Sequence, residues 1–363
     1  MSVPISSLTS FSYHRQRLGR EGSEAGQVLR DIIGVYSWHP SAPLSLLARV
    51  KNFKVNDFYR IDSEKLAYRV PAMRLSNYML PANMAFRIMN AVVPLPDDFI
   101  WVKRYSNAAR IVPTEIYPEW KRSILKITGS PLESSEIKKM TKIPDISLKP
   151  TLNRMAFEGE LLRVGSQSLR SNIISYISTK SLTGDTYKAI DPDKELSWLA
   201  SEYLRAFGPA RIKDFQWWAG VTSTRAKAAM SHWDTEDIGN DLLILKQDIK
   251  EFEKVKPLTK DSIDIIPQWD SYTMGYAPDG RQRFVNPDVQ QQVYSNIGAT
   301  GGNGLGLVLL NGSALAVWEP KFTGNNLKIK LNLFEKPTSA INDKIKKGFD
   351  EIGAFLGAKK VSI

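Results

Sequence analysis

The sequence contains no cysteine, and its only three histidines, His14, His39 and His232, lie far apart along the chain. Without cysteine, the chain cannot form a disulfide framework, an iron–sulfur cluster, a cysteine-ligated zinc finger or a cysteine nucleophile. Three scattered histidines also argue against a histidine metal site. We therefore expect neither a metal nor a cofactor, and neither a Ser-His-Asp order nor an HExxH zinc motif is visible.

Long apolar runs are also missing. The first 20 residues lack the continuous apolar core of a signal peptide. The longest apolar stretch, residues 305–318, is interrupted by Asn311-Gly312-Ser313 and is too short to span a bilayer. These features predict a soluble, cytoplasmic protein. The glycine-rich segment 298–306 lacks the Gly-Lys-Ser/Thr of a phosphate-binding loop and precedes strand-like sequence, so it is interpreted as a hairpin connection.

Positive charge, in contrast, is abundant and unevenly distributed. The chain of 363 residues carries a formal net charge of +11, and residues 1–190 account for all of it. A basic half of a protein indicates a polyanionic partner. The alternative is a generally basic, solvated surface, because net charge alone discriminates weakly.

Helical periodicity is clearest in the segment 191–260. Asp191 and Pro192 suit the start of a helix that ends before Gly208-Pro209, and its apolar residues recur three or four apart. A second short helix should end at Gly220, a third should begin near Thr222, and residues 242–245 should form a strand. Three helices with a tight glycine turn, followed by a strand, are typical of a winged helix.

The segment 113–190 repeats this order. Helices are predicted around 120–127, 135–140 and 148–155, followed by strands at 160–165 and 172–178. The two helix-turn-helix pairs are thus expected at 133–158 and 211–233, with a wing at about 160–177. Beyond residue 261, short strands alternate with turns and precede an amphipathic helix at 341–355.

The predicted fold class is α+β, with tandem winged-helix units and a C-terminal β-rich domain. The expected divisions are a winged-helix-like domain at 1–112, winged-helix domains at 113–190 and 191–260, and the β-rich domain at 261–363. The third helix of each unit and its wing are the natural readers of double-stranded DNA. The DNA-binding candidates on these elements are Lys149, Arg154, Arg163, Arg170, Arg225 and Lys227.

Several segments resemble one family, the AlkZ-like DNA glycosylases, which are winged-helix DNA-binding proteins. Leu44-Ser-Leu-Leu-Ala-Arg-Val50 resembles the family's LxLWARV segment, and Ala72-Met-Arg-Leu-Ser-Asn-Tyr-Met-Leu-Pro81 resembles AMRGTLHLVP. The remaining likenesses are of Tyr13-His-Arg-Gln-Arg-Leu18 to the family's opening, of Gly208-Pro-Ala-Arg-Ile-Lys-Asp-Phe-Gln-Trp-Trp-Ala-Gly-Val221 to GPATxxDFAWWxGL, and of Ile265-Ile-Pro-Gln-Trp-Asp-Ser-Tyr-Thr-Met-Gly-Tyr276 to LLPxFDxxxLGY. The resemblance implies three winged-helix units around a concave DNA-binding face.

The catalytic motif of the family is not matched. Glycosylases of this family carry Gln-x-Gln or Gln-x-Asp shortly before the LxLWARV segment, where this chain has Tyr36 and Trp38, or Val35 and Ser37 if the alignment shifts by one residue. The histidine of the family's RGTLH segment corresponds to Tyr78. Cleavage of an N-glycosidic bond needs a positioned water and stabilisation of a cationic sugar. Of the nearby groups, only His39 is an obvious candidate to orient water.

Two functions follow from this mismatch. The first is a DNA-binding protein of the family without ordinary glycosylase chemistry. The alternative is an active glycosylase for bulky or crosslinked N-alkylpurines that uses other residues around Tyr36, Trp38 and His39. A winged-helix protein-interaction scaffold is a third hypothesis, which the charge of residues 1–190 disfavours.

Overall fold

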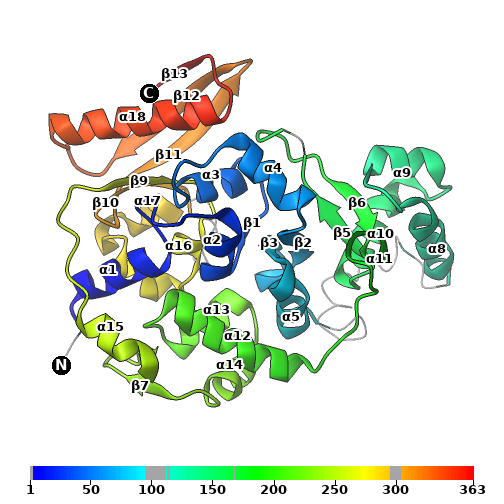
Figure 1. The fold of residues 1–363 in the computed structure, drawn as a ribbon, viewed down its shortest axis with the longest axis horizontal. Coiled ribbons are helices and arrows are strands. Elements are labelled where there is room, and N and C mark those ends of the chain that lie inside the picture. The colour runs from blue at the N-terminus through cyan, green and yellow to red at the C-terminus, as the bar shows by residue number, and fades with distance from the viewer. Residues whose placement is uncertain (1–2, 95–111, 113–114, 167, 295–303) are drawn as a thin grey trace.

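The structure, a computed structural model, describes residues 3–94, 112, 115–166, 168–294 and 304–363. Most of the glycine-rich segment 298–306 therefore lies outside the described residues. The predicted boundary after residue 112 lies next to undescribed residues. In Figure 1 the first part of the chain occupies the centre, the second lies to the right, the third at the bottom, and the C-terminal sheet at the top. None of the described helices combines the length and apolar character that a membrane span requires.

The first part of the chain surrounds a small antiparallel sheet. Strand β2 pairs with β3, with Ala67 opposite Pro81 at one end and Pro71 opposite Asn77 at the other. Strand β3 also pairs with the short β1. Helix α5 packs on β2 and β3. The elements are α1 (Ile5–Arg15), α2 (Ala25–Asp31), β1 (Val35–Tyr36), α3 (Ser41–Leu47), α4 (Val55–Ser63), β2 (Ala67–Pro71), the 3-10 turn η1 (Met73–Leu75), β3 (Asn77–Pro81) and α5 (Ala82–Val92).

The second part has the predicted order of three helices followed by a hairpin. Its elements are α8 (Tyr117–Ile127), β4 (Leu132–Glu133), α9 (Ser134–Met140), α10 (Asp145–Phe157), β5 (Leu161–Val164), β6 (Ser175–Ser178) and α11 (Thr179–Thr183). The hairpin β5–β6 is not isolated, because β5 pairs with β2 at the single register position Arg69–Arg163. The first two parts therefore share one six-stranded sheet of order β1-β3-β2-β5-β6-β4.

The third part also follows the predicted order. It contains α12 (Pro192–Phe207), α13 (Ile212–Ala219), α14 (Ser223–Met230), β7 (Thr235–Asp237), β8 (Leu243–Leu245), the 3-10 turn η2 (Lys246–Asp248) and α15 (Ile249–Glu253). The apolar spacing of the sequence predicts that Trp218 and Trp233 are core residues. Trp218 is buried. Trp233 is instead 36% exposed, because α14 ends at Met230 and its apolar face does not reach Trp233.

The C-terminal part is an open antiparallel sheet with one parallel edge strand, in the order β13-β12-β11-β10-β9, and α18 packs on β9. The predicted strands and the amphipathic helix are all present. The elements are β9 (Ile263–Ile266), α16 (Ser271–Met274), η3 (Pro278–Arg283), η4 (Pro287–Val289), α17 (Gln290–Tyr294), β10 (Gly306–Leu310), β11 (Ser313–Thr323), β12 (Asn326–Leu333), α18 (Ser339–Phe355) and β13 (Lys360–Ser362).

The hydrophobic core crosses the boundaries expected from the sequence. One cluster joins residues of the first, third and C-terminal parts, including Leu80, Tyr203 and Leu307. A second cluster joins the first part to α18. Among the described residues, a third cluster, around Ile124 and Leu152, draws only on positions 112–176. The second part thus has a core of its own, but Leu162 and Ile177 of its hairpin also belong to the first cluster, and Leu169 belongs to the second.

A buried ion pair joins the first and C-terminal parts. The Arg49 guanidinium donates to both carboxylate oxygens of Asp270, at 2.6 and 2.7 Å, and both side chains are fully buried. The other Arg49 N–H groups reach the Ser45 and Gln16 carbonyls, at 2.8 Å each, and Ser271 Oγ at 3.3 Å. All five donors of the guanidinium are therefore used. These residues belong to three separate segments that each resemble the family.

We predict that Arg49→Met lowers the free energy of unfolding by about 3–5 kcal/mol, because it leaves the Asp270 carboxylate buried without its cation. Chemical denaturation measures this loss. The matched control is Arg60→Met, which removes an exposed arginine paired with Glu64 at 2.6 Å and should leave the denaturation midpoint nearly unchanged. Equal midpoints for Arg49→Met and the wild type would contradict the structural role of the pair.

Candidate functional site

Four aromatic side chains meet where the family's catalytic motif is expected. They are Tyr36, Trp38, Tyr78 and Trp269, here called the aromatic cluster. Tyr36 and Tyr78 are register partners in β1 and β3, so their rings lie on one face of the sheet, 5.8 Å apart. Trp269 lies 4.9 Å from Tyr36 and 6.1 Å from Trp38. Trp38 is 49% exposed, so the cluster has one open ring.

The cluster offers few groups that could activate water. An indole donates hydrogen bonds but does not accept them. Burial, reinforced by the neighbouring Tyr78, raises the pKa of the Tyr36 hydroxyl, although Ser76 and Arg74 oppose that shift. Tyr36 is therefore neutral at physiological pH. The aromatic cluster suits stacking better than proton abstraction.

His39, the remaining catalytic candidate, is committed to structural contacts. Its main-chain N–H donates to Asn172 Oδ1 at 2.7 Å, and Asn172 Nδ2 donates to its carbonyl at 2.8 Å. The imidazole Nδ1 lies 3.1 Å from the Ser168 carbonyl, and the ring packs on Phe58. Burial lowers the pKa of His39, so the imidazole is neutral near pH 7. The loop between β5 and β6 thus holds the segment that carries Trp38.

A second group of aromatic and cationic side chains lies beside the cluster. The Arg74 guanidinium stacks on the ring of Trp217 at 4.1 Å. Arg281 lies 4.9 Å from the same ring and 3.8 Å from the ring of Tyr294. Since the charge of Arg74 acts on Tyr36, the two groups are neighbours. Residues of the first, third and C-terminal parts therefore converge at one place.

The DNA-binding candidates of the second part have different environments. Lys149, on α10, is exposed. Arg154 is half-buried over the Tyr117 ring and is paired with Glu158 at 2.9 Å. Arg170 is exposed and donates to the Gly324 carbonyl of the β11–β12 turn at 3.3 Å. Arg163 is buried instead of lying on the surface of a wing, because β5 joins the shared sheet, and it donates to Asn77 and Asn153.

The candidates of the third part lie on α14. Lys227 is exposed, whereas Arg225 is half-buried and donates to Asp193 at 2.8 Å and to the Ala91 carbonyl at 3.2 Å. Figure 1 shows α10 at the right and α14 at the bottom, so the two groups of candidates occupy separate parts of the protein. Of all these candidates, Arg163 approaches the aromatic cluster, because it donates to Asn77, the neighbour of Tyr78 in β3.

Sequence reasoning did not identify Trp269, Arg74, Trp217 or Arg281 as site residues. Arg74, Trp217 and Trp269 lie within the segments that resemble the family, whereas Arg281 does not. The sequence predicts Trp217 as a core residue, because it lies in an apolar helical segment. Their side chains meet only through contacts between distant parts of the chain. The signal in the sequence that could have indicated them is the arginine or tryptophan that each of these segments carries.

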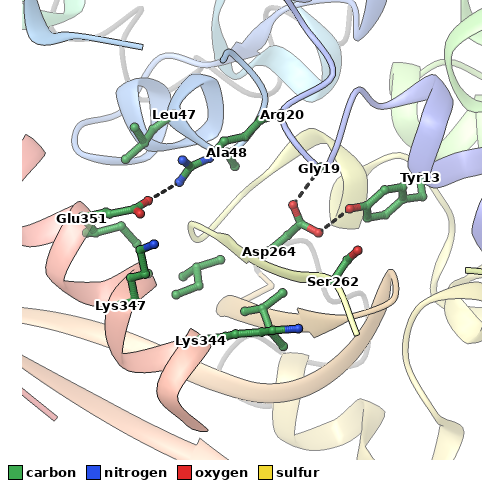
Figure 2. A pocket seen from close by; sticks show the side chains of 14 residues that line it. Tyr13, Gly19, Arg20, Leu47, Ala48, Ser262, Asp264, Lys344, Lys347 and Glu351 are labelled. Atoms are coloured by element: carbon green, nitrogen blue, oxygen red, sulfur yellow. Dashed lines mark hydrogen bonds and ion pairs between the residues drawn. The ribbon is translucent and has the colours of Figure 1, made fainter. Parts of the chain in front are cut away.

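A cavity of about 330 Å³ lies between the N-terminal segment, the end of α3, β9 and α18. As Figure 2 shows, Asp264 accepts hydrogen bonds there from Tyr13 Oη at 2.6 Å and from the Gly19 N–H at 2.8 Å, while Arg20 pairs with Glu351. Burial raises the pKa of Asp264, against the effect of both hydrogen bonds. None of the lining residues belongs to the aromatic cluster, and the contacts of Asp264 anchor the N-terminal segment.

Two comparisons with known proteins found matches. The family model described as "DNA glycosylase AlkZ-like" matches residues 34–355. The chain belongs to the AlkZ-like DNA glycosylase family. It is also similar in structure to Streptomyces sahachiroi DNA glycosylase AlkZ, with a TM-score of 0.75, 17% identity and 100% of both chains covered. No curated protein matches.

Membership of the AlkZ-like family confirms the resemblance stated from the sequence, and the mixed helices and sheets confirm the α+β class. At 17% identity, the likeness to the solved glycosylase establishes the fold alone. Among the described residues, no group of three or more histidine, aspartate or glutamate side chains could hold a metal ion.

The buried His39 leads to a prediction on pH. Its pKa is lowered in the folded state from a usual value of 6.5, so the unfolded chain binds the proton more readily. The resulting stabilisation is complete above pH 6.5 and is lost as the pH falls toward the folded-state pKa. We predict that the melting temperature falls between pH 7.5 and 5.5 by more in the wild type than in His39→Gln. Identical pH profiles for the two proteins would contradict a buried neutral imidazole.

Proposed function

We propose that this protein binds double-stranded DNA and stacks on it with the aromatic cluster, without the glycosylase chemistry of the Gln-x-Gln or Gln-x-Asp motif. The observation that supports this most is the half-exposed Trp38, which stands at a motif position and packs edge-on against Trp269. An exposed aromatic ring stacks, irrespective of sequence, on a base that has left the duplex stack. We propose that it acts in the cytoplasm, the location that the sequence predicts.

We further interpret the repeated order of three helices and a hairpin as tandem winged-helix units. The second part, α8 to β6, and the third part, α12 to β8, follow this order. Residues 1–112 supply the related first unit, and residues 261–363 the β-rich domain. Helices α10 and α14 carry the exposed Lys149 and Lys227, which suit phosphate contacts. Arg170 lies on the wing of the second unit, while Arg154 and Arg225 reach DNA only by exchanging their carboxylate partners.

The second candidate is an active glycosylase for bulky or crosslinked N-alkylpurines. The observation that favours it is that the rings of Trp38 and Trp269 cross at 88°, which offers a base and its bulky substituent two separate ring surfaces. An alkylated purine is already cationic and leaves readily, so positioning contributes much of the catalysis. Against this candidate stand the neutral Tyr36 and the committed His39.

Duplex binding is tested by its dependence on salt. We predict that the affinity for duplex DNA falls steeply between about 50 and about 200 mM salt, because phosphate contacts release counterions. Trp38→Ala should weaken binding by about tenfold, as expected for one lost stacking contact. Trp233→Ala is the matched control, because Trp233 is 36% exposed but lies outside the aromatic cluster. Absence of duplex binding at low salt would exclude the proposed function.

Excision is tested separately. We predict that the wild-type protein releases no base from an N7-alkylguanine duplex that it binds, since no amide or carboxylate stands at the motif positions. Abasic sites are scored by strand cleavage in alkali, with spontaneous depurination of the same duplex as the baseline. The double variant Tyr36→Gln/Trp38→Gln restores amides and provides the comparison. Strong excision by the wild type would establish the second candidate in place of the first.

A further inference from the structure

Arg74 lies in an unusual backbone turn between β2 and β3. Arg74 and Leu75 have φ values of 53° and 58°, and Leu75 stands where the family segment AMRGTLHLVP has glycine. Non-glycine residues rarely adopt this left-handed conformation, and two in succession are strained. The turn is closed by the hydrogen bond from the Ala72 N–H to the Ser76 carbonyl at 2.8 Å. The fold therefore maintains a strained turn at the position of this arginine.

Residues of the third part of the chain pack against both the backbone and the side chain of Arg74. Gly220 ends α13 with φ at 76°, and a Cβ atom there would lie 3.0 Å from Arg74 Cα. The turn between α13 and α14 thus packs directly on the Arg74 backbone. The indole of Trp217 then supports the guanidinium at 4.1 Å. Because a guanidinium is attracted to an indole face, the contact with Trp217 restricts the orientations of the Arg74 side chain.

The guanidinium of Arg74 has no anionic partner in the described part of the chain. Its Nε is buried without a hydrogen-bond acceptor there. Other half-buried arginines differ: Arg211 pairs with Asp214 at 2.8 Å, and Arg225 pairs with Asp193 at 2.8 Å. A second cation, Arg281, lies 4.9 Å from the centre of the same Trp217 ring that Arg74 contacts. Arg74 therefore keeps its charge beside the aromatic cluster with no carboxylate paired to it among the described residues.

We propose that Arg74 binds a phosphate of the DNA strand whose nucleotide stacks on the aromatic cluster. A guanidinium presents two parallel donors to phosphate oxygens, and the Trp217 ring holds its plane fixed while it does so. Arg74 is thus a positioning residue that sets the register of the strand relative to Trp38. This inference rests on the proposed function, because it assumes that the protein binds duplex DNA.

The test compares Arg74→Gln with Arg60→Gln, a control that removes the same charge from an exposed arginine on α4. Arg74→Gln should weaken binding about tenfold on every duplex sequence and reduce the slope of log affinity against log salt by about one. Arg60→Gln should change neither quantity. Arg74→Lys, which keeps the charge but loses the planar donors, should keep the slope and lose part of the affinity. An unchanged affinity and slope in Arg74→Gln would overturn the inference while leaving the proposed function intact.

A second measurement judges the site independently of duplex binding. Inorganic phosphate replaces chloride at constant ionic strength, and the melting temperatures of the wild type and Arg74→Gln are compared. The general stabilisation by phosphate is common to both proteins, whereas binding at Arg74 adds an increment only in the wild type. Equal increments in the two proteins would contradict the site. Failure of the wild type to bind any duplex would instead contradict the proposed function.

Discussion

The bidentate pair between Arg49 and Asp270 determines where the candidate site lies. Arg49 follows α3, which begins directly after the segment of Trp38 and His39, and Asp270 follows Trp269 in the sequence. Because the pair joins these two segments at 2.6 and 2.7 Å, it brings Trp269 against Tyr36. A buried charge pair is directional, whereas hydrophobic contacts tolerate sliding. The geometry of the aromatic cluster thus depends on a contact in which none of its rings takes part.

The loop of the second part adds a further constraint on the same segment. Asn172 donates and accepts one hydrogen bond each with the main chain of His39, in the manner of a neighbouring strand. Arg170, two residues earlier, reaches the turn between β11 and β12. The second part has its own core, yet these contacts and the single pairing of β2 with β5 connect it to the others. Any displacement of this loop on DNA would therefore be transmitted to Trp38.

Much of the fold was predictable because its signals are local. Asp191 caps α12 by accepting from the Asp193 N–H at 3.0 Å, and Gly220 takes the left-handed conformation that ends α13. Alternation and turns likewise predicted the C-terminal strands. The burial of Arg163 was not predictable, since it depends on β5 joining a strand about 90 residues earlier in the sequence. Leu75 itself gives no signal for a positive φ, and only the glycine at this position of the family segment indicates the turn.

The candidate site was predictable only in part, for a related reason. The resemblance to the family located Tyr36 and Trp38, but it could not show that their partner is Trp269, more than 200 residues away. It also left His39 open as a catalytic group. The structure argues against that role because the His39 side chain is buried, with its ring packed on Phe58.

Aromatic residues at the motif positions change what the site can stabilise. An amide or carboxylate acts on the reacting sugar through a held water and a developing positive charge, and so lowers the barrier to bond cleavage. A ring acts on the bound nucleotide through stacking, which is present before any bond breaks and so favours binding without favouring the transition state. In the proposed function, replacing the first kind of group by the second preserves recognition while removing the differential stabilisation on which catalysis depends. The strained turn at Arg74 and the half-exposed Trp38 are consistent with a site that has been shaped for binding, since both orient groups toward a ligand and neither supplies a proton acceptor.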